Sequence, residues 1–325
     1  MAQSAAPLLP MDRQAVLAAE LPRYNVRQLT NTIASVILFI LTFLSVLFLV
    51  LIVGFVLVRG ISTIFPIVDG HITFNVGYFT EPGAAPGELN ADGTPHPGGV
   101  LNGIVGTLEM LAMGALIAVP IGLGTAIYLS EYSVGRLAEI VRFIVNLLAG
   151  LPSVLVGLFI WALLIHGIAG DGSGILAYSG FAGSLALAVI IIPIVASSVE
   201  SILKLVPNEL REAGYALGLA KWRVVLRIVL PTVGGGVATG VLLSLARAAG
   251  ETAPLLLTAG GANQFVNTDL GAPMSALTVQ IYNYATSAYK TQQDQAWGNA
   301  LVLVALIAMF SAAVRLITSR KQYDN

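Results

Sequence analysis

The feature that most constrains this chain is an uncharged run, Thr32–Val58, with the sequence "TIASVILFILTFLSVLFLVLIVGFVLV". About 20 apolar residues are enough for a helix to cross a bilayer. A secretory signal peptide has a shorter apolar core, about 7–15 residues, followed by a small-residue cleavage site. Because this run is longer and follows a polar tail, we interpret it as a retained first membrane span.

The composition supports residence in a membrane. Hydrophobic residues make up 56% of the 325 and charged residues only 10%, with a mean hydropathy of +0.85. Soluble domains usually have about a quarter charged residues. Cysteine is absent, which excludes disulfides and thiolate metal sites. The three histidines are isolated and no nucleophile–base pattern is present, so we predict no catalytic residue, no metal site and no nucleic-acid partner.

Further apolar segments follow the first, and each is long enough to span a bilayer. Together they predict an all-α membrane protein with six transmembrane helices in one domain. The later segments are about Leu101–Leu129, Ile140–Ile165, Phe181–Leu203, Val224–Thr258 and Trp297–Ile317.

The basic residues predict the orientation of these spans. With six spans, 13 of the 16 basic residues fall on one side, and only Arg59, Arg247 and Lys290 fall elsewhere. Loops rich in Lys and Arg stay in the cytoplasm. We therefore expect both termini to be cytoplasmic.

The segments outside the spans define the remaining organisation. We predict a cytoplasmic tail over 1–31, whose "MDRQAVLAAELPRY" resembles an amphipathic surface helix, a six-helix domain over 32–317, and a short tail over 318–325. The Gly- and Pro-rich residues 60–100 predict an irregular external loop. In the second external segment, "PMSALTVQIYNYATSA" is either a short interfacial helix, with Tyr282 and Tyr284 at headgroup depth, or a plain loop.

One cytoplasmic connection, at about 205–231, is unusually charged. Pro207 and Asn208 suit a helix start and Gly218 suits a helix end, so we predict a short helix over Asn208–Leu217. A second helix then opens at Lys221 and is interrupted by Pro231. Because so short a helix is not stable alone, it must dock on its own bundle or on a partner; the alternative is a loop that only orients the protein.

The same connection carries a family pattern. Its fixed positions, Glu212, Ala213, Gly218, Ile228, Leu230 and Pro231, resemble the EAA loop of permease subunits of ATP-binding-cassette (ABC) importers, although Gly214 stands where the family usually has a second alanine. The resemblance implies a type I ABC importer permease fold and a helix that contacts a separate ATPase. The implied coupling residues are Arg211, Glu212, Ala213, Gly214 and Gly218. ATP and Mg²⁺ would be bound by that ATPase, and this chain lacks a Gly-x-x-x-x-Gly-Lys-Ser/Thr phosphate loop.

Ionisable residues within spans are costly and usually functional. Arg247 and Glu251 are four residues apart, so on a helix they would share a face and pair, and Pro254 should kink the helix at Gly250. The Arg247 guanidinium offers a fork of donors suited to phosphate or carboxylate oxygens. The alternative is a structural salt bridge near the outer interface.

Other polar residues in the spans are candidates either for the transport pathway or for contacts between helices. Glu109 lies in the second span, and three alternatives stay open: it pairs with Arg247, faces the transport pathway, or lies near the outer interface. Pro152 should kink the third span, where Asn146 and Ser153 offer hydrogen bonds. Such residues often join helices rather than bind a substrate.

Three stretches sharpen the resemblance: "AIYLSEY" (126–132), "AGLPSVLVGLF" (149–159) and "RAAGETAPLLLTAG" (247–260). They resemble PstA-type permeases of bacterial phosphate importers. The resemblance implies a multi-pass protein of the bacterial inner membrane and partners of PstC type (permease), PstB type (ATPase dimer) and PstS type (periplasmic phosphate-binding protein). Phosphate would pass residues drawn from Arg247, Glu251, Thr252, Ser153 and Asn146.

Two other functions compete with this interpretation. The first is an ABC permease for another oxyanion or small solute. The second is a secondary transporter or channel, which the EAA pattern disfavours because that pattern belongs to ATP-driven importers.

Overall fold

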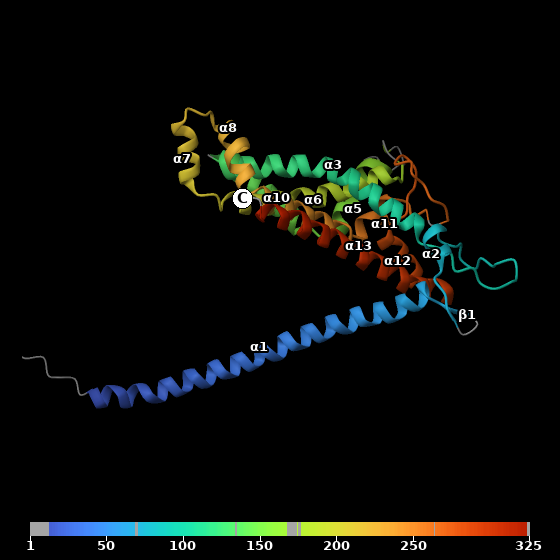
Figure 1. The fold of residues 1–325 in the computed structure, drawn as a ribbon, viewed down its shortest axis with the longest axis horizontal. Helices are drawn as coiled ribbons and strands as arrows, with labels where there is room; N and C mark the ends of the chain where they lie inside the picture. Colours follow the sequence, from blue (N-terminus) through green and yellow to red (C-terminus); the bar gives the residue numbers. More distant parts are fainter. Residues whose placement is uncertain are drawn as a thin grey trace, which may run out of the picture. The chain divides into compact units, whose positions relative to one another are not determined.

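The computed structural model describes residues 13–68, 71–133, 135–167, 174, 177–262 and 264–323. Side chains are described for all of these residues except 13–26, 68 and 314–323. Helices dominate this part of the chain (Figure 1). The elements are α1 (Arg13–Ile64), β1 (Ile67–Val68), β2 (His71–Ile72), α2 (Val76–Thr80), α3 (Leu101–Glu131), α4 (Arg136–Gly150), α5 (Ser153–Ile160), the π-helical turn η1 (Trp161–His166), α6 (Gly180–Leu203), α7 (Asn208–Ala216), α8 (Lys221–Val224), the π-helical turn η2 (Val225–Val229), α9 (Leu230–Thr232), α10 (Gly234–Ala248), α11 (Ala253–Thr258), α12 (Leu277–Ala285) and α13 (Lys290–Tyr323).

The membrane spans take two forms. Among the described residues, four helices are long and apolar enough to cross a membrane: α1 from Arg27, α3, α6 and α13 to Ala313. Two further candidates are bent pairs, α4 with α5 and η1 at 102°, and α8 to α9 with α10 at 77°. The six predicted spans are therefore all helical, and counting each bent pair as one span gives six.

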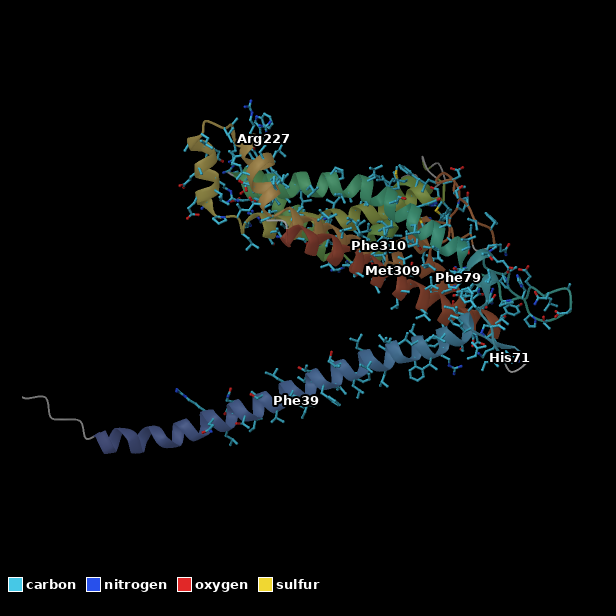
Figure 2. The ribbon with its side chains drawn as sticks, viewed as in Figure 1. Phe39, His71, Phe79, Arg227, Met309 and Phe310 are labelled. Atoms are coloured by element: carbon cyan, nitrogen blue, oxygen red, sulfur yellow. The ribbon has the colours of Figure 1, made fainter. Side chains whose placement is uncertain are left out.

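The chain divides into two compact units, the first ending at Phe55 and the second beginning at Val56. In the first unit α1 is apolar on every side, and side chains such as Phe39 are exposed (Figure 2), as expected for a helix that faces lipid or another membrane helix. The amphipathic surface helix was predicted over 11–24; its residues from 13 onward belong to α1 itself, and 11 and 12 lie outside the described part of the chain. Their side chains lie outside the described part of the chain.

The core of the second unit is the packing of α3 against α6. Met110, Leu187, Ile191 and Val195 are almost fully buried in it. Small residues let the two backbones approach: a Cβ on Gly114 would lie 3.1 Å from the Ser184 carbonyl oxygen. Close approach at glycine is typical of helix packing inside a membrane, where dispersion replaces the hydrophobic effect as the driving force.

Buried polar groups hold the end of the second unit near α12. The Gly99 carbonyl accepts hydrogen bonds from Gln295 Nε2 at 3.2 Å and Gln280 Nε2 at 3.5 Å. The Tyr78 hydroxyl donates to Asn299 Oδ1 at 2.6 Å. Burial, with a smaller contribution from the nearby Tyr284, raises the pKa of the Tyr78 phenol, so it remains a donor. Residues 60–100 are thereby attached to α12 and α13 even though they contain little regular structure.

The segment predicted as either an interfacial helix or a loop is helix α12. Its Tyr282 is half exposed, whereas Tyr284 is buried. Tyr284 receives a hydrogen bond from Gln280 Nε2 at 3.5 Å. Headgroup depth for both tyrosines stays a prediction, and the structure adds that the Tyr284 ring is enclosed by protein.

The opposite end of the second unit holds the predicted short helix, observed as α7 (Figure 1). It closes with a left-handed Gly218 at φ +76°, whose N–H bonds the Tyr215 carbonyl while Leu219 N–H bonds the Gly214 carbonyl. This is a Schellman motif. The N-cap, however, is Pro207, and the Asn208 side chain instead accepts a hydrogen bond from Arg211 Nη1 at 3.3 Å.

The second helix of this connection is also present. It opens with α8 at Lys221, and Trp222 is 54% exposed. Figure 2 shows Arg227 at the same end of the unit, and its side chain is exposed. Beyond the 77° bend at Val233, α10 runs back into the bundle. A helix–turn–helix therefore projects charged and aromatic side chains from one end of the unit.

Candidate functional site

A cavity of about 320 Å³ brings together three of the five residues predicted for the substrate pathway. We call it the pathway cavity. Its walls come from α4, α5, α6, α10 and the segment after α10. Lining residues are Leu148, Ala149, Leu151, Ser153, Ile190, Ile194, Ser197, Ser198, Arg247 and Glu251.

Two helix breaks shape this cavity, and both follow from proline. The chain breaks between α4 and α5 at Leu151-Pro152, and between α10 and α11 just before Pro254, as the sequence predicted. Broken backbone at membrane depth occurs where it is buried in protein or lines a cavity. The helices that follow the two breaks, α5 and α11, pack closely, because a Cβ on Gly157 would lie only 2.6 Å from Pro254 Cα.

The two charged residues of the cavity differ from their predicted arrangement. Helix α10 ends at Ala248, so Glu251 lies beyond it and does not share a helical face with Arg247. Within the described part of the chain, neither side chain makes a hydrogen bond or an ion pair. The predicted i,i+4 pair is therefore wrong, and its physical cause is the helix break at Gly250.

The helix ends suit these charges. Arg247 is in the last turn of α10, where the helix dipole favours a cation. Glu251 precedes the first turn of α11, where the dipole favours an anion. Arg247 is exposed and Glu251 half-buried. An exposed guanidinium with all its donors free is available to an oxyanion in the cavity.

Three hydroxyl groups complete the cavity. Ser153 begins α5, and Ser197 and Ser198 are neighbours in α6. Ser197 donates to the Pro193 carbonyl of its own helix, whereas Ser198 makes no hydrogen bond with the described residues. Neither α6 serine was among the predicted pathway residues, although a Ser-Ser pair within an apolar span is a signal that could have found them.

The other intramembrane candidates lie elsewhere. Asn146 is on an exposed face of α4, and Thr252 is half-buried at the start of α11; neither lines the pathway cavity. Glu109 does not line it either, and its Oε2 is buried without a hydrogen-bond partner among the described residues. Its predicted pairing with Arg247 is not formed.

The predicted coupling residues divide into two groups. Glu212 and Ala213 are exposed on α7, and Gly218 closes that helix. Gly214 is buried, and a Cβ there would lie 2.8 Å from Ile228 Cδ1 and 3.0 Å from Val224 Cγ2. The glycine that departs from the family pattern therefore permits close packing of α7 on α8 and η2.

Arg211 points inward. Its guanidinium is 14% exposed and bonds Glu131 at the end of α3, with Nη2 to Oε1 at 2.7 Å. The same guanidinium donates to the carbonyls of Leu203 at 3.0 Å and Val206 at 2.5 Å. A side chain held in this way positions α7 on its own bundle and does not face a partner.

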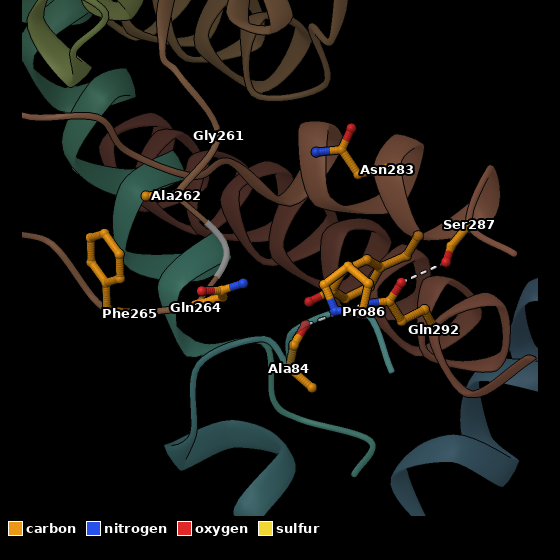
Figure 3. Close-up of a pocket in the computed structure, with 10 residues that line it drawn as sticks. Ala84, Pro86, Gly261, Ala262, Gln264, Phe265, Asn283, Ser287 and Gln292 are labelled. Carbon is orange, nitrogen blue, oxygen red and sulfur yellow. Dashed lines mark hydrogen bonds between the residues drawn. The ribbon is translucent and has the colours of Figure 1, made fainter. Parts of the chain in front are cut away.

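A larger cavity, about 540 Å³, lies at the α12 end (Figure 3). Ser287 Oγ donates to Gln292 Oε1 at 2.6 Å, and Gln292 Nε2 donates to the Ala84 carbonyl at 3.2 Å. Its described lining residues are all uncharged. Because recognition of an anion needs compensating charge or many aligned donors, we place the candidate transport site in the smaller pathway cavity.

Comparison with known proteins agrees with this architecture. Residues 118–322 match the family described as "Binding-protein-dependent transport system inner membrane component". The chain belongs to this family. The match runs from the second half of α3 into α13, and it therefore includes the helix–turn–helix and all lining residues of the pathway cavity. Members are components of the inner membrane, which agrees with the apolar helices of this chain.

Individual relatives can be aligned with this chain over most of its length. "Phosphate transport system permease protein PstA" of Pasteurella multocida (strain Pm70) is 40% identical over 238 residues, 72% of this chain and 82% of the relative. The protein of the same name from Yersinia pestis is 40% identical over 237 residues, which cover 71% of this chain and 77% of the relative. "Phosphate transport system permease protein PstA 1" of Mycobacterium tuberculosis (strain CDC 1551 / Oshkosh) is 39% identical over 229 residues, which cover 69% of this chain and 73% of the relative.

The fold also resembles that of a solved importer. An inward-facing structure of the MetNI methionine ABC transporter aligns with a TM-score of 0.52 over 67% of this chain and 95% of that one. At 23% identity, the likeness shows the ABC importer permease fold and carries no information on the substrate.

Proposed function

We propose that this chain is the PstA-type permease subunit of an ATP-driven importer of inorganic phosphate and forms half of the translocation pathway. The observation that carries the proposal is the pathway cavity, where Arg247, which has no partner among the described residues, lines the same space as the hydroxyl groups of Ser153, Ser197 and Ser198. The names of relatives that are 39–40% identical support phosphate as the substrate.

The chemistry of the cavity suits transient binding of phosphate. Arg247 supplies charge-assisted hydrogen bonds to phosphate oxygens, and Ser153 and Ser198 supply hydroxyl donors. Glu251 repels an anion, which limits how tightly the site holds it. A pathway site must bind strongly enough to admit the ion and weakly enough to release it.

The energy comes from a different polypeptide. A PstB-type ATPase dimer binds ATP and Mg²⁺, and this chain is a non-catalytic subunit without a cofactor of its own. The exposed residues Glu212 and Ala213 of α7 contact that ATPase. A PstC-type permease forms the other half of the pathway, and a PstS-type binding protein delivers phosphate from the periplasm.

In the resulting cycle the ATPases close on ATP, α7 moves with them, and the bundle opens outward to receive phosphate. ATP hydrolysis then returns the bundle to an inward-facing state. This alternating access needs a bundle with two discrete arrangements. The bends at Leu151-Pro152 and Val233 are places where segments of a span can rotate.

Reconstitution tests the proposal. The chain is purified with the three partner types, incorporated into vesicles, and assayed for uptake of radiolabelled phosphate with and without ATP. We expect ATP-dependent uptake that excess arsenate inhibits and excess sulfate does not. ATP-dependent uptake of another oxyanion without phosphate would make the chain a permease for that solute. Uptake without the ATPase, driven by an ion gradient, would make it a secondary transporter.

A further inference from the structure

One motif of the sequence is still without a role: "AIYLSEY" (126–132), whose last residues lie at the end of α3. In the structure this end meets the helix–turn–helix. Glu131 bonds Arg211 of α7, and the Tyr132 ring lies under Lys221 of α8, with Nζ 4.7 Å from the ring centroid. Both helices of the connection therefore contact two successive residues.

The Glu131–Arg211 contact has the geometry of a rigid joint. Arg211 Nε lies 3.2 Å from Oε1 and 3.1 Å from Oε2, and Nη2 lies 2.7 Å from Oε1. The carboxylate is 4% exposed and the guanidinium 14%. A forked, charge-assisted contact of this kind fixes orientation as well as distance. Removing one partner would leave the other charge buried without compensation.

The same guanidinium also joins α6. Its bonds to the carbonyls of Leu203 and Val206 satisfy backbone groups at and beyond the C-terminus of α6, where a cation is favoured by the helix dipole. One side chain of α7 thus connects the ends of α3 and α6, which are the two helices of the central core. Movement of α7 cannot leave these helices behind without breaking four hydrogen bonds or more.

We propose that Glu131 and Arg211 are positioning residues for energy coupling: they make α7 and α3 move as one body, so that displacement of α7 reaches the pathway cavity. Tyr132 and Lys221 extend the same attachment to α8. This inference rests on the proposed function. Glu131 and Arg211 transmit displacement from α7 to α3 within this chain, and they do not themselves contact the ATPase.

Helix α6 connects α3 to the pathway cavity. Helix α3 packs along α6 through Gly114 and Gly122. A Cβ on Gly114 would lie 3.1 Å from Ser184 O, and a Cβ on Gly122 would lie 2.8 Å from Val195 Cβ. Helix α6 in turn supplies Ser197 and Ser198 to the cavity wall. Because glycine contacts bring the backbones so close, the helices have little freedom to slide independently.

The test compares coupling in the reconstituted complex. ATP hydrolysed per phosphate imported is measured for the wild type, Glu131→Gln and the exchanged pair Glu131→Arg with Arg211→Glu. We expect Glu131→Gln to raise this ratio by about tenfold, with the complex still assembled, and the exchanged pair to recover coupling only in part, because a carboxylate at position 211 cannot donate to the Leu203 and Val206 carbonyls. Asp294→Asn is the control, since it removes an exposed ion pair with Lys290 at the other end and should leave the ratio unchanged.

The outcomes separate the two proposals. If the wild-type complex does not import phosphate with ATP, the proposed function fails. If it does, and assembled Glu131→Gln has the wild-type ratio, the joint has no role in coupling. Should Glu131→Gln fail to assemble, Arg211→Lys decides, because lysine keeps the charge but cannot bridge α3 and α6 as a fork; a wild-type ratio there overturns the inference.

A distance measurement provides a readout that does not depend on turnover. The chain has no cysteine, so spin labels can be placed at Glu209→Cys in α7 and Ile121→Cys in α3, both exposed. We expect one narrow distance distribution with the same mean in nucleotide-free and ATP-trapped complexes. A mean that changes between the two states would overturn the inference, because α7 would then move relative to α3.

Discussion

Two groups of charged residues in the same bundle behave in opposite ways. At the α7 end every buried carboxylate is paired: Glu131 with Arg211, and Glu200 with Arg142 at 2.9 Å and Lys204 at 2.7 Å. In the pathway cavity, Arg247 and Glu251 have no partner among the described residues. Burial without pairing is costly, so the buried carboxylates are held by direct ion pairs, whereas the more exposed Arg247 and Glu251 stay free, under the proposed function, to meet an anion.

The electrostatic cost is kept low in different ways at the two places. Glu200 is 11% exposed and Glu131 4%, so both need direct ionic partners. Arg247 is exposed to the cavity and sits at a helix end that favours its charge. The difference teaches that solvent access and the helix dipole can replace a counter-ion, which leaves the guanidinium free for a transported anion.

The largest expected effect comes from removing the unpaired cation. Arg247→Gln removes charge-assisted hydrogen bonds worth about 1.5–3 kcal/mol, which corresponds to a loss of about tenfold to a hundredfold in phosphate uptake. The assembled complex should have unchanged thermal stability, because Arg247 has no described partner. Lys290→Gln, which removes a cation at the other end, is the control. Wild-type uptake by Arg247→Gln would remove Arg247 from the pathway.

The close contact between α5 and α11, the helices that follow the two breaks, gives the next largest effect. Gly157→Ala places a methyl group 2.6 Å from Pro254 Cα, where backbone must move, and overpacking of this kind costs about 1–3 kcal/mol. Thermal unfolding of the purified protein in detergent should show the loss. Gly124→Ala is the matched control, since its Cβ would meet nothing within 4 Å. Equal stability of both variants would show that α5 and α11 are not in close contact.

The same substitution at a paired and an unpaired glutamate tests the comparison directly. Glu200→Gln should lower stability by about 1–2 kcal/mol, less than the 3–5 of a fully buried pair because Arg142 and Lys204 are 41% and 55% exposed. Glu251→Gln should change stability by less than about 0.5 kcal/mol but should alter phosphate uptake. Thermal unfolding and vesicle uptake measured on both variants check this. Destabilisation by Glu251→Gln alone would reverse the assignment of the two regions.

The smallest effect is expected at the glycine that departs from the family pattern. Gly214→Ala gains about 1 kcal/mol of helix propensity, but its Cβ would lie 2.8 Å from Ile228 Cδ1. That atom is the end of a flexible side chain, so a small rotation relieves the contact. We expect a net change below about 1 kcal/mol in thermal unfolding. A loss as large as that of Gly157→Ala would show that η2 cannot yield.

Local patterns accounted for much of the fold. The apolar runs predicted the spans, and Pro152, Pro254 and Gly218 predicted two helix breaks and a helix end. These effects act within one or two turns, since a proline removes one backbone donor and a glycine permits one left-handed residue. The start signals Pro207 and Asn208 and the end signal Gly218 predicted α7 to within one residue.

The candidate site was predicted less completely. Arg247, Glu251 and Ser153 were found because ionisable or hydroxyl groups beside proline are conspicuous in an apolar segment. Ser197 and Ser198 were missed because their helix α6 is otherwise unremarkable and their relation to Arg247 depends on packing. Asn146 and Thr252 were chosen for their neighbours in sequence, and they lie outside the cavity lining.

The sequence by itself determined that this chain spans a membrane, where its helices break, and which family of inner membrane components it belongs to. Only the tertiary structure decided which charges are paired. Arg211 and Glu131 are 80 residues apart, and Arg142 and Glu200 are 58 apart, while Arg247 and Glu251, four apart, do not pair. The physical reason is that backbone preferences are local, whereas an ion pair forms where packing brings two side chains together.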